Sequence, residues 1–200
     1  MQLSIITVGH VHTDALAALT NHFTRLEQVV VDLPPDASVE RHRADFNRAV
    51  DAAANDWILL LREREILDPP LAQEIAEAAA AAKAWGFRIR SVPFYCGRPL
   101  RLGVPDGDLR LFHRRHLLRR GPLAVQGTVV RLRGSLRSVS FESTDEHRAH
   151  LLRTEVPHSG LRTLLVFLKH GLAARTLDGN TLRYLWIEAS FDSGGKRSPR

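Results

Sequence analysis

The sequence predicts an α/β domain with a mostly parallel sheet and helices on both faces, continued by a C-terminal helical extension. Strand-like and helix-like segments alternate along residues 1–92, which is the pattern of parallel strands joined by helices. The strand-like segments are short apolar runs typical of buried strands. The 200 residues are 44% hydrophobic and 25% charged, which excludes a wholly disordered, collagen-like or disulfide-knotted chain.

The first part of the chain contains four predicted strands and three predicted helices. Thr13 or Asp14 caps the first helix and Ser38 caps the second, while the prolines at 34 and 35 mark a turn because they cannot donate to a strand ladder. Pro69-Pro70 suits a helix start, and Gly86 is expected to end that alanine-rich helix. The predicted strands are Leu3–Val8, Val29–Asp32, Asp56–Leu61 and Phe87–Val92, and the helices span 13–23, 38–54 and 69–84.

After Pro93 the pattern changes to short apolar pieces separated by glycine and proline turns. These pieces predict antiparallel strands added to the sheet, and three further helices follow them. We expect one domain over residues 1–141, a helical extension over 142–192 packed on it, and a disordered tail over 193–200. The strands are Asp108–Phe112, Thr128–Leu132 and Leu136–Phe141, and the helices begin at Thr144 or Asp145, at Gly160 and at Asp178.

The positive charge of the chain is concentrated in its middle third. The formal net charge is +6, but residues 88–137 hold 12 arginines and only two acids, Asp106 and Asp108. Because guanidinium groups match phosphate oxygens in pairs, this block predicts a polyanionic partner, and a merely solvated basic surface remains the alternative. The arginines expected to share one face near the carboxyl ends of the parallel strands are Arg98, Arg101, Arg110, Arg114 and Arg115.

Other sequence features point to a cytoplasmic protein. The single cysteine, Cys96, cannot form an internal disulfide, which fits a reducing compartment. The first ten residues lack the basic and long apolar regions of a secretory signal, and no apolar run reaches the ~18 residues of a simple membrane span.

Several short sequence motifs, taken in their order and spacing, resemble those of a known protein family over most of the chain. They are Leu3–Thr7, Val29–Asp32, Asn47–Ala49, Asp56–Leu61, Gly97-Arg98, Pro105-Asp106, Leu109–Phe112, Phe167–Lys169 and Leu177–Gly179. In these motifs the chain resembles family 2 glycosyltransferases of the GT-A fold, in the branch that builds lipopolysaccharide or lipooligosaccharide cores. The resemblance implies a Rossmann-like GT-A domain that transfers a sugar from a nucleotide-sugar to a hydroxyl of a cell-envelope glycan.

The same resemblance implies a donor site, from which this sequence departs. Thr7 and Asp32 map onto the nucleotide-binding region. The family's Asp-X-Asp, which holds Mg²⁺ or Mn²⁺ against the diphosphate, is replaced here by Arg62-Glu63-Arg64. We therefore expect no metal cofactor, and we expect Glu63 and Glu65 to face away from the donor pocket. Arg62 and Arg64 either supply the positive charge of the metal or, as the favoured alternative, are rim residues of a lost site that pair with Glu63 and Glu65. A short segment with Pro34-Pro35 and a missing His-Glu word are further departures, so a catalytically inactive relative that binds a glycan, nucleotide or protein remains the alternative.

The acceptor side is assigned to the acids and arginines of the basic block. Asp106 and Asp108 are candidates for the base that deprotonates the acceptor, and a plain turn paired with Arg110 is the alternative. A phosphorylated or acidic glycan is the expected acceptor, and contact with the inner face of the cytoplasmic membrane is a further expectation. An aromatic content of 6% and the lack of an RNA-binding word place a nucleic-acid or anionic-membrane binder third. The expected acceptor-binding residues are Arg98, Arg110, Arg114 and Arg115.

Overall fold

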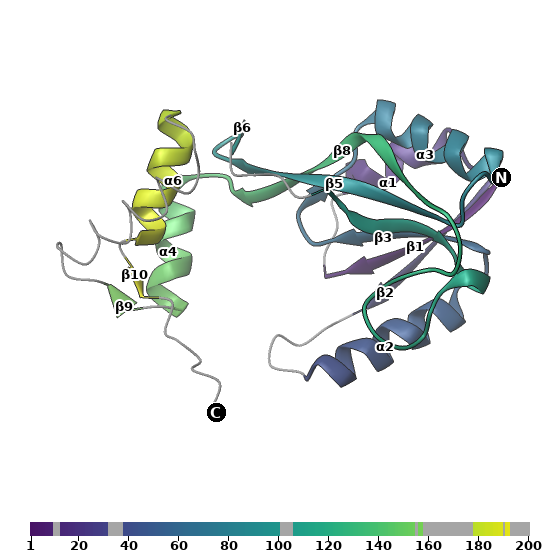
Figure 1. Ribbon diagram of the computed structural model, residues 1–200. Coiled ribbons are helices and arrows are strands. Elements are labelled where there is room, and N and C mark those ends of the chain that lie inside the picture. The colour runs from purple at the N-terminus through teal and green to yellow at the C-terminus, as the bar shows by residue number, and fades with distance from the viewer. Residues whose placement is uncertain are drawn as a thin grey trace. The chain divides into compact units, whose positions relative to one another are not determined.

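A computed structural model describes residues 1–9, 13–31, 38–100, 106–154, 156–157, 178–189 and 191–192 (Figure 1). The chain forms two compact units, the first from Met1–Ser91 and Pro105–Ser138, the second from Val92–Val104 and Val139–Arg200. The division therefore differs from the boundary predicted at residue 141, because Val92–Val104 joins the C-terminal part. Predictions on Asp32, on Arg101, on the helix beginning at Gly160 and on the tail 193–200 lie outside the described residues.

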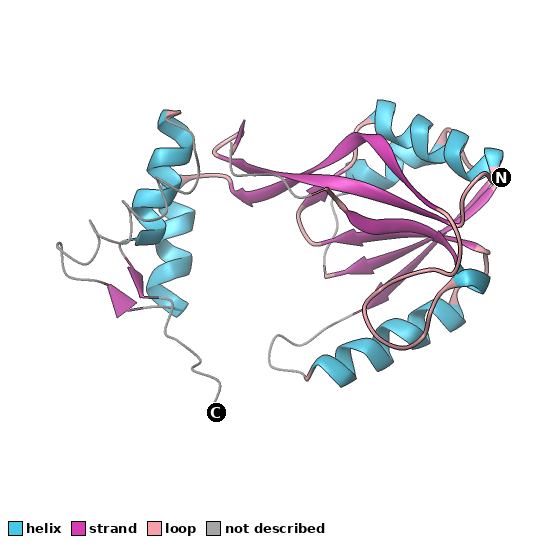
Figure 2. Ribbon diagram, in the orientation of Figure 1, coloured by secondary structure: helices cyan, strands magenta, loops and turns pink. Residues whose placement is uncertain are grey.

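A mixed sheet forms the centre of the first unit, with the strand order β2-β1-β3-β7-β5-β8-β4 (Figure 2). β1 pairs in parallel with both β2 and β3, whereas β7 is antiparallel to both β3 and β5, so β5 runs in the same direction as β1. The α/β class is confirmed, but the sheet is mixed rather than mostly parallel. The strands are β1 (Gln2–Val8), β2 (Arg25–Val31), β3 (Trp57–Arg62), β4 (Glu65–Ile66), β5 (Gly86–Tyr95), β7 (Asp108–His113) and β8 (Val129–Phe141), and β6 (Arg98–Pro99) pairs with β5.

Helices cover both faces of this sheet, as predicted. Because side chains alternate along a strand, β1 sends Ile5 to one face and Ile6 to the other. The first core, which contains Ile5, lies on the side of α1 (Thr13–Thr20) and α3 (Pro69–Ala81), and the second core, which contains Ile6, lies on the side of α2 (Val39–Ala52). Figure 1 shows α2 on the opposite side of the sheet from α1 and α3.

Local signals account for the helix starts better than for the helix ends. The Ser38 hydroxyl accepts from the Arg41 backbone N–H, and the Asp68 carboxylate accepts from that of Leu71, so both predicted starts are confirmed. α3 ends earlier than predicted, at Ala82 in the left-handed conformation (φ 47°), and Gly86 lies in β5 instead.

A single 13-residue strand, β8, replaces the two strands predicted over residues 128–141. The glycine that suggested a break, Gly134, lies inside the strand. A Cβ at this position would meet Leu71 Cδ1 of α3 at 2.9 Å. Gly134 therefore permits close packing of helix on strand rather than a turn.

The second unit contains a small core of its own. Tyr95, Leu100, Leu151 and Ile187 are buried together. Asp178 accepts hydrogen bonds from two backbone N–H groups at the start of α6, which confirms the predicted helix start. No helix in the described part of either unit is both long enough and apolar enough to cross a membrane. The elements of this unit are α4 (Thr144–Thr154), α6 (Gly179–Ala189) and the antiparallel pair β9 (Val156–Pro157) and β10 (Phe191–Asp192).

Candidate functional site

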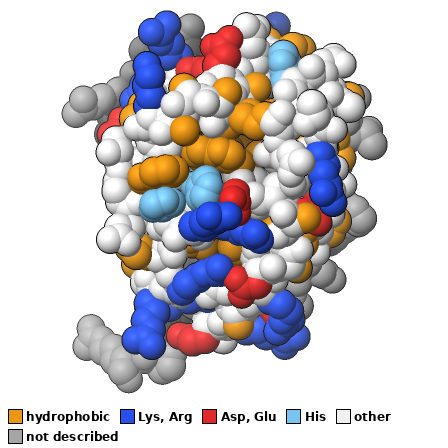
Figure 3. Space-filling view, turned by 90° about the vertical axis from the view of Figure 1, so that its right-hand side faces the viewer, with side chains coloured by type: hydrophobic (Ala, Val, Ile, Leu, Met, Phe, Trp, Pro, Cys, Tyr) orange, Lys and Arg blue, Asp and Glu red, His pale blue; other side chains and the backbone are white. Residues whose placement is uncertain are grey.

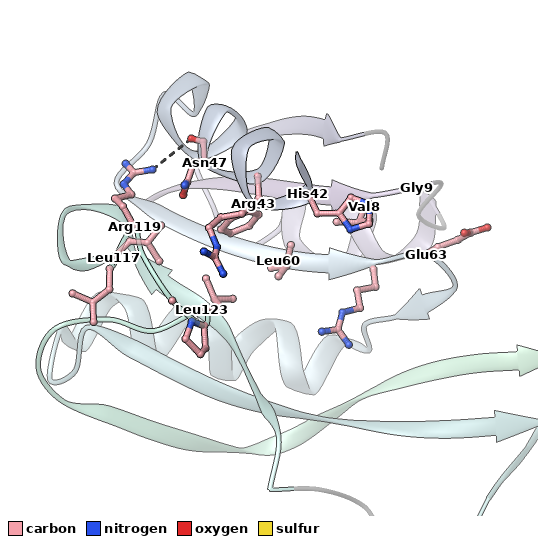
Figure 4. Close-up of a pocket in the computed structure, with 15 residues that line it drawn as sticks. Val8, Gly9, His42, Arg43, Asn47, Leu60, Glu63, Leu117, Arg119 and Leu123 are labelled. Atoms are coloured by element: carbon pink, nitrogen blue, oxygen red, sulfur yellow. Dashed lines mark hydrogen bonds between the residues drawn. The ribbon is translucent and has the colours of Figure 1, made fainter. Parts of the chain in front are cut away.

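A pocket of about 770 Å³ lies in the first unit and extends along α2, from the carboxyl ends of β1 and β3 to the loop over residues 117–123 (Figure 4). This is the position at which open α/β sheets bind ligands, because the strands end there and the following loops diverge. The loop over residues 117–123 forms the remaining wall. The lining residues are Val8, Gly9, His42, Arg43, Phe46, Asn47, Leu60, Arg62, Glu63, Leu117, Leu118, Arg119, Gly121, Pro122 and Leu123.

The pocket combines apolar walls with an excess of positive charge. Phe46, Leu60 and Leu117 belong to the second core or pack against it. Among the described lining residues there are three arginines and one carboxylate, Glu63. Such a lining suits an anionic ligand that also carries a ring or another apolar part.

Arg43 is the most available cation of the pocket. Figure 4 shows its side chain leaving α2 and pointing into the space between the helix and the loop 117–123. No ion pair joins Arg43 to any acid in the described part of the chain. Arg119, in contrast, is committed to the protein: it binds Asp51 Oδ1 at 2.6 Å and the Asn47 carbonyl at 3.4 Å, and so ties the loop to α2.

Of the two arginines predicted to replace the metal, only Arg62 reaches the pocket. Its Nη2 lies 3.1 Å from Asp108 Oδ2, and both side chains are 56% exposed. Arg64 lies in the turn between β3 and β4 with a φ of 61° and does not line the pocket. The prediction treated residues 62–65 as an extended strand, but the chain turns at 63–64, so the alternation of side chains stops there.

The two glutamates of this segment separate for the same reason. Glu63 lies on the rim of the pocket, and a Cβ at the neighbouring Gly9 would be 3.2 Å from its carboxylate. Figure 4 shows the Glu63 carboxylate pointing outwards, away from the other lining side chains, so it touches the pocket at its edge only. Glu65 also faces away: it is 2% exposed, and it accepts from the Arg62 backbone N–H at 2.8 Å and from the Ser91 hydroxyl at 3.3 Å.

Arg110, predicted to bind the acceptor, is instead a buried partner of Glu65. Its side chain is 1% exposed and its Nη2 lies 2.7 Å from Glu65 Oε1. The register passes from Leu111 opposite Phe87 to Leu109 opposite Arg88, so Arg110 is the extra residue of a β-bulge, a feature that re-aims side chains. Burial lowers the pKa of Arg110, and the charge of Glu65 opposes that shift. The prediction of acceptor binding is wrong for this residue because it has no surface.

The candidate bases Asp106 and Asp108 do not line the pocket. Asp108 is held by Arg62 and lies 3.7 Å from Arg110 Nη2. Asp106 is 94% exposed and pairs with Arg131 at 3.4 Å. Within the described ranges no three His, Cys, Asp or Glu side chains come close enough together to hold a metal ion.

Arg114 and Arg115 lie beside the amino end of β3 and are not among the described lining residues of the pocket. They form the short helix η1 (Arg114–His116), and both bind Asp56, which precedes β3, at 3.0 and 2.9 Å. Burial raises the pKa of Asp56, but the hydrogen bond from Arg114 and the charges of Arg115 and His113 outweigh it, so the pKa lies below its usual range. Figure 3 looks onto this end of the first unit, where basic and acidic side chains are interspersed beside histidines.

The predicted contiguous face of five arginines is therefore wrong. Arg110 is buried, Arg114 and Arg115 lie at the amino end of β3, and Arg98 belongs to the second unit. Thr7, predicted to bind the nucleotide, is buried in β1, where its hydroxyl accepts from Gln28 of β2 at 3.2 Å.

The contribution of α2 to the pocket is not among the features predicted from the sequence. Arg43, Phe46 and Asn47 are three and four residues apart, so they share one face of the helix. This spacing was visible in the sequence, although nothing local showed that the face lies over the ends of β1 and β3.

No protein-family model matches the chain, and no curated protein matches it in sequence.

Proposed function

We propose that the chain is a family 2 glycosyltransferase-like protein of the GT-A type, which binds a nucleotide-sugar in the pocket beside α2 and transfers the sugar to a hydroxyl of a cell-envelope glycan. The observation that carries the proposal is the placement of Arg43 and Arg62 at the carboxyl ends of β1 and β3, in a pocket with apolar walls. A mixed sheet with helices on both faces is compatible with this fold.

Arginine supplies the electrostatic part of this chemistry. When the sugar leaves, the diphosphate gains negative charge that a cation must neutralise. Arg43 and Arg62 together provide two guanidinium forks, which bind phosphate oxygens through paired N–H groups. Asn47 and the walls formed by Phe46 and Leu60 are left to hold the ring parts of the ligand.

The divalent metal of the resembled family does not fit this pocket. Of the lining residues that the structure describes, only Glu63 carries a carboxylate, and Arg62 precedes it in the chain. Hard divalent cations require several oxygen ligands, and adjacent guanidinium groups repel them. The proposed sugar transfer therefore uses no metal ion.

A second candidate, ligand binding without transfer, is favoured by the positions of the acids. Asp108 is engaged by Arg62, and Asp106 lies outside the pocket, so neither predicted base faces the ligand. Both candidates place the protein in the cytoplasm, at the inner face of the membrane, where nucleotide-sugars meet envelope precursors.

The test is a titration of nucleotides and nucleotide-sugars into matched arginine variants. Arg43→Ala and Arg62→Ala should each weaken binding of the preferred nucleotide at least tenfold, because each removes a phosphate contact. Arg48→Ala, on the exposed side of α2, and Arg64→Ala, in the turn outside the pocket, should stay within twofold of the wild type. Equal binding by all four variants would refute the pocket. Release of the nucleotide from its sugar in the presence of lipopolysaccharide then separates transfer from binding alone.

A further inference from the structure

The α2 side of the sheet carries an arginine face that the proposed donor pocket does not use. A Cβ at Gly86 would lie 2.7 Å from Leu109 and 2.8 Å from Val125, both in the second core, and 3.5 Å from Val129. Gly86 and Val129 therefore face the α2 side. By the alternation of side chains, the same side receives the residues that form the arginine face, namely Arg88 and Arg90 of β5 and Arg131, Arg133 and Arg137 of β8.

The buried residues of the two strands confirm this assignment. Phe87 and Ile89 of β5, and Leu132 and Leu136 of β8, all belong to the first core, on the side of α1 and α3. The residues between them must then point to the other side. Four of the five arginines are exposed, and Arg90 is half-buried.

Few acids balance this charge. Arg131 pairs with Asp106, and Arg88 donates to the Gly107 carbonyl at 3.2 Å, so these two arginines hold the segment that precedes β7. Arg90 and Arg133 have no ion pair with any acid in the described part of the chain. Among Arg88, Arg90, Arg131 and Arg133, the described residues thus show one ion pair with a carboxylate, that of Arg131 with Asp106.

The arginine face lies on the same side of the sheet as the pocket. The pocket is built on β1 and β3, and the arginine face on β5 and β8, with only β7 between β3 and β5. Neighbouring strands are about 4.8 Å apart, so two strand spacings, roughly 10 Å, separate β3 from β5. α2 is the one helix of the described first unit whose residues join the second core, so no second helix shields β5 and β8 on this side.

We propose that the arginine face binds a polyanionic glycan through its phosphate groups and presents it to the pocket as the acceptor. Arginines two residues apart on a strand are about 7 Å apart, which lets successive forks engage separate anionic groups on one extended chain. The eight residues on this side of Gly86–Arg90 and Val129–Arg137 include no aromatic side chain, so the base-stacking platform of single-strand nucleic-acid binders is missing among them. The role of acceptor site rests on the proposed function, whereas binding of the polyanion does not.

The test uses a deacylated lipopolysaccharide core oligosaccharide with its phosphates, the same oligosaccharide after dephosphorylation, and a single-stranded RNA 20-mer. The phosphorylated glycan should bind most tightly, and its affinity should fall steeply with salt because exposed charges are screened. The double variant Arg90→Gln/Arg133→Gln should lose at least tenfold in affinity for it. Arg41→Gln/Arg48→Gln, a matched pair of exposed arginines on α2, should bind within twofold of the wild type.

Three results would overturn the proposal: equal binding by the first double variant, equal binding of the dephosphorylated glycan, or tighter binding of the RNA. Arg43→Ala distinguishes glycan binding on the arginine face from nucleotide binding in the pocket. This variant should weaken nucleotide binding and leave the affinity for the phosphorylated glycan unchanged. If the nucleotide titration fails and the glycan titration succeeds, the proposed donor site falls and the arginine face stands.

Discussion

Buried Arg110 shows how one residue organises the turn beside the pocket. A guanidinium without water is costly unless an acid compensates it, and here Glu65 does so at 2.7 Å. The other oxygen of Glu65 accepts from the Arg62 backbone N–H at 2.8 Å. The buried pair therefore fixes the backbone of Arg62, the residue that the proposal places on the phosphate.

At this scale we predict that Glu65→Gln destabilises the protein by about 3–5 kcal/mol, because it leaves the charge of Arg110 buried and unpaired. Glu63→Gln, two residues earlier and exposed on the pocket rim, should change the free energy of unfolding by less than about 0.5 kcal/mol. Urea unfolding followed by circular dichroism measures both. Similar losses in the two variants would show that the Glu65–Arg110 pair has no special role.

The burial of Arg110 could not be predicted from the local sequence. Nothing near Arg110 in the chain indicates burial, because its partner is 45 residues earlier and the bulge that re-aims it depends on pairing with β5. Arg64 illustrates the reverse case. The run of residues 56–61 predicted a strand correctly, but only the positive φ of Arg64 shows that the chain turns directly afterwards.

At the scale of elements, α4 and α6 are joined through a buried histidine. His147 of α4 is fully buried, and its Nε2 lies 2.9 Å from Glu188 Oε1 of α6. Its ring stacks on Phe141 and on Tyr184, with centroids 4.2 and 5.1 Å away. Burial raises the pKa of Glu188, but hydrogen bonds from His147 and Tyr184 outweigh it, and the pKa lies below the usual 4.5.

This lowered pKa predicts how stability depends on pH. A carboxyl group whose pKa is lowered by folding stabilises the protein above its unfolded pKa and loses that contribution as pH falls through the folded value. We therefore expect Glu188→Gln to lower the melting temperature at pH 7 and to approach the wild type below pH 4. Glu142→Gln, exposed just before α4, serves as the control and should follow the wild type throughout. A constant difference between Glu188→Gln and the wild type across this pH range would contradict the account.

The strands of the first unit show which part of the topology local pattern can predict. The apolar runs at β1, β3 and β5 and the capped helices between them predicted an α/β fold correctly. The insertion of β7 between β3 and β5 follows from long-range antiparallel pairing, for which the local sequence has no signal. For the same reason the prediction grouped arginines that are close in sequence. The arginine face of the structure instead combines residues of β5 and β8, two strands about 40 residues apart in the chain.

Across the whole molecule, the arginines of residues 88–137 have different roles, which depend on the elements that carry them. Arg114 and Arg115 bind Asp56 at the amino end of β3, and Arg119 binds Asp51 and closes the pocket loop. Five further arginines lie on the α2 side of the sheet, on β5 and β8. A high net charge alone indicates a polyanionic partner, and the distribution over the sheet indicates where that partner binds.

In the proposed function, arginine and not a metal ion binds the diphosphate. The most direct measurement is calorimetric titration of UDP and GDP into the wild-type protein, once in EDTA and once with excess Mn²⁺. We expect the preferred nucleotide to bind with the same affinity, within twofold, under both conditions, because the described lining of the pocket has three guanidinium groups and one carboxylate. Binding that appears only with Mn²⁺ would contradict it.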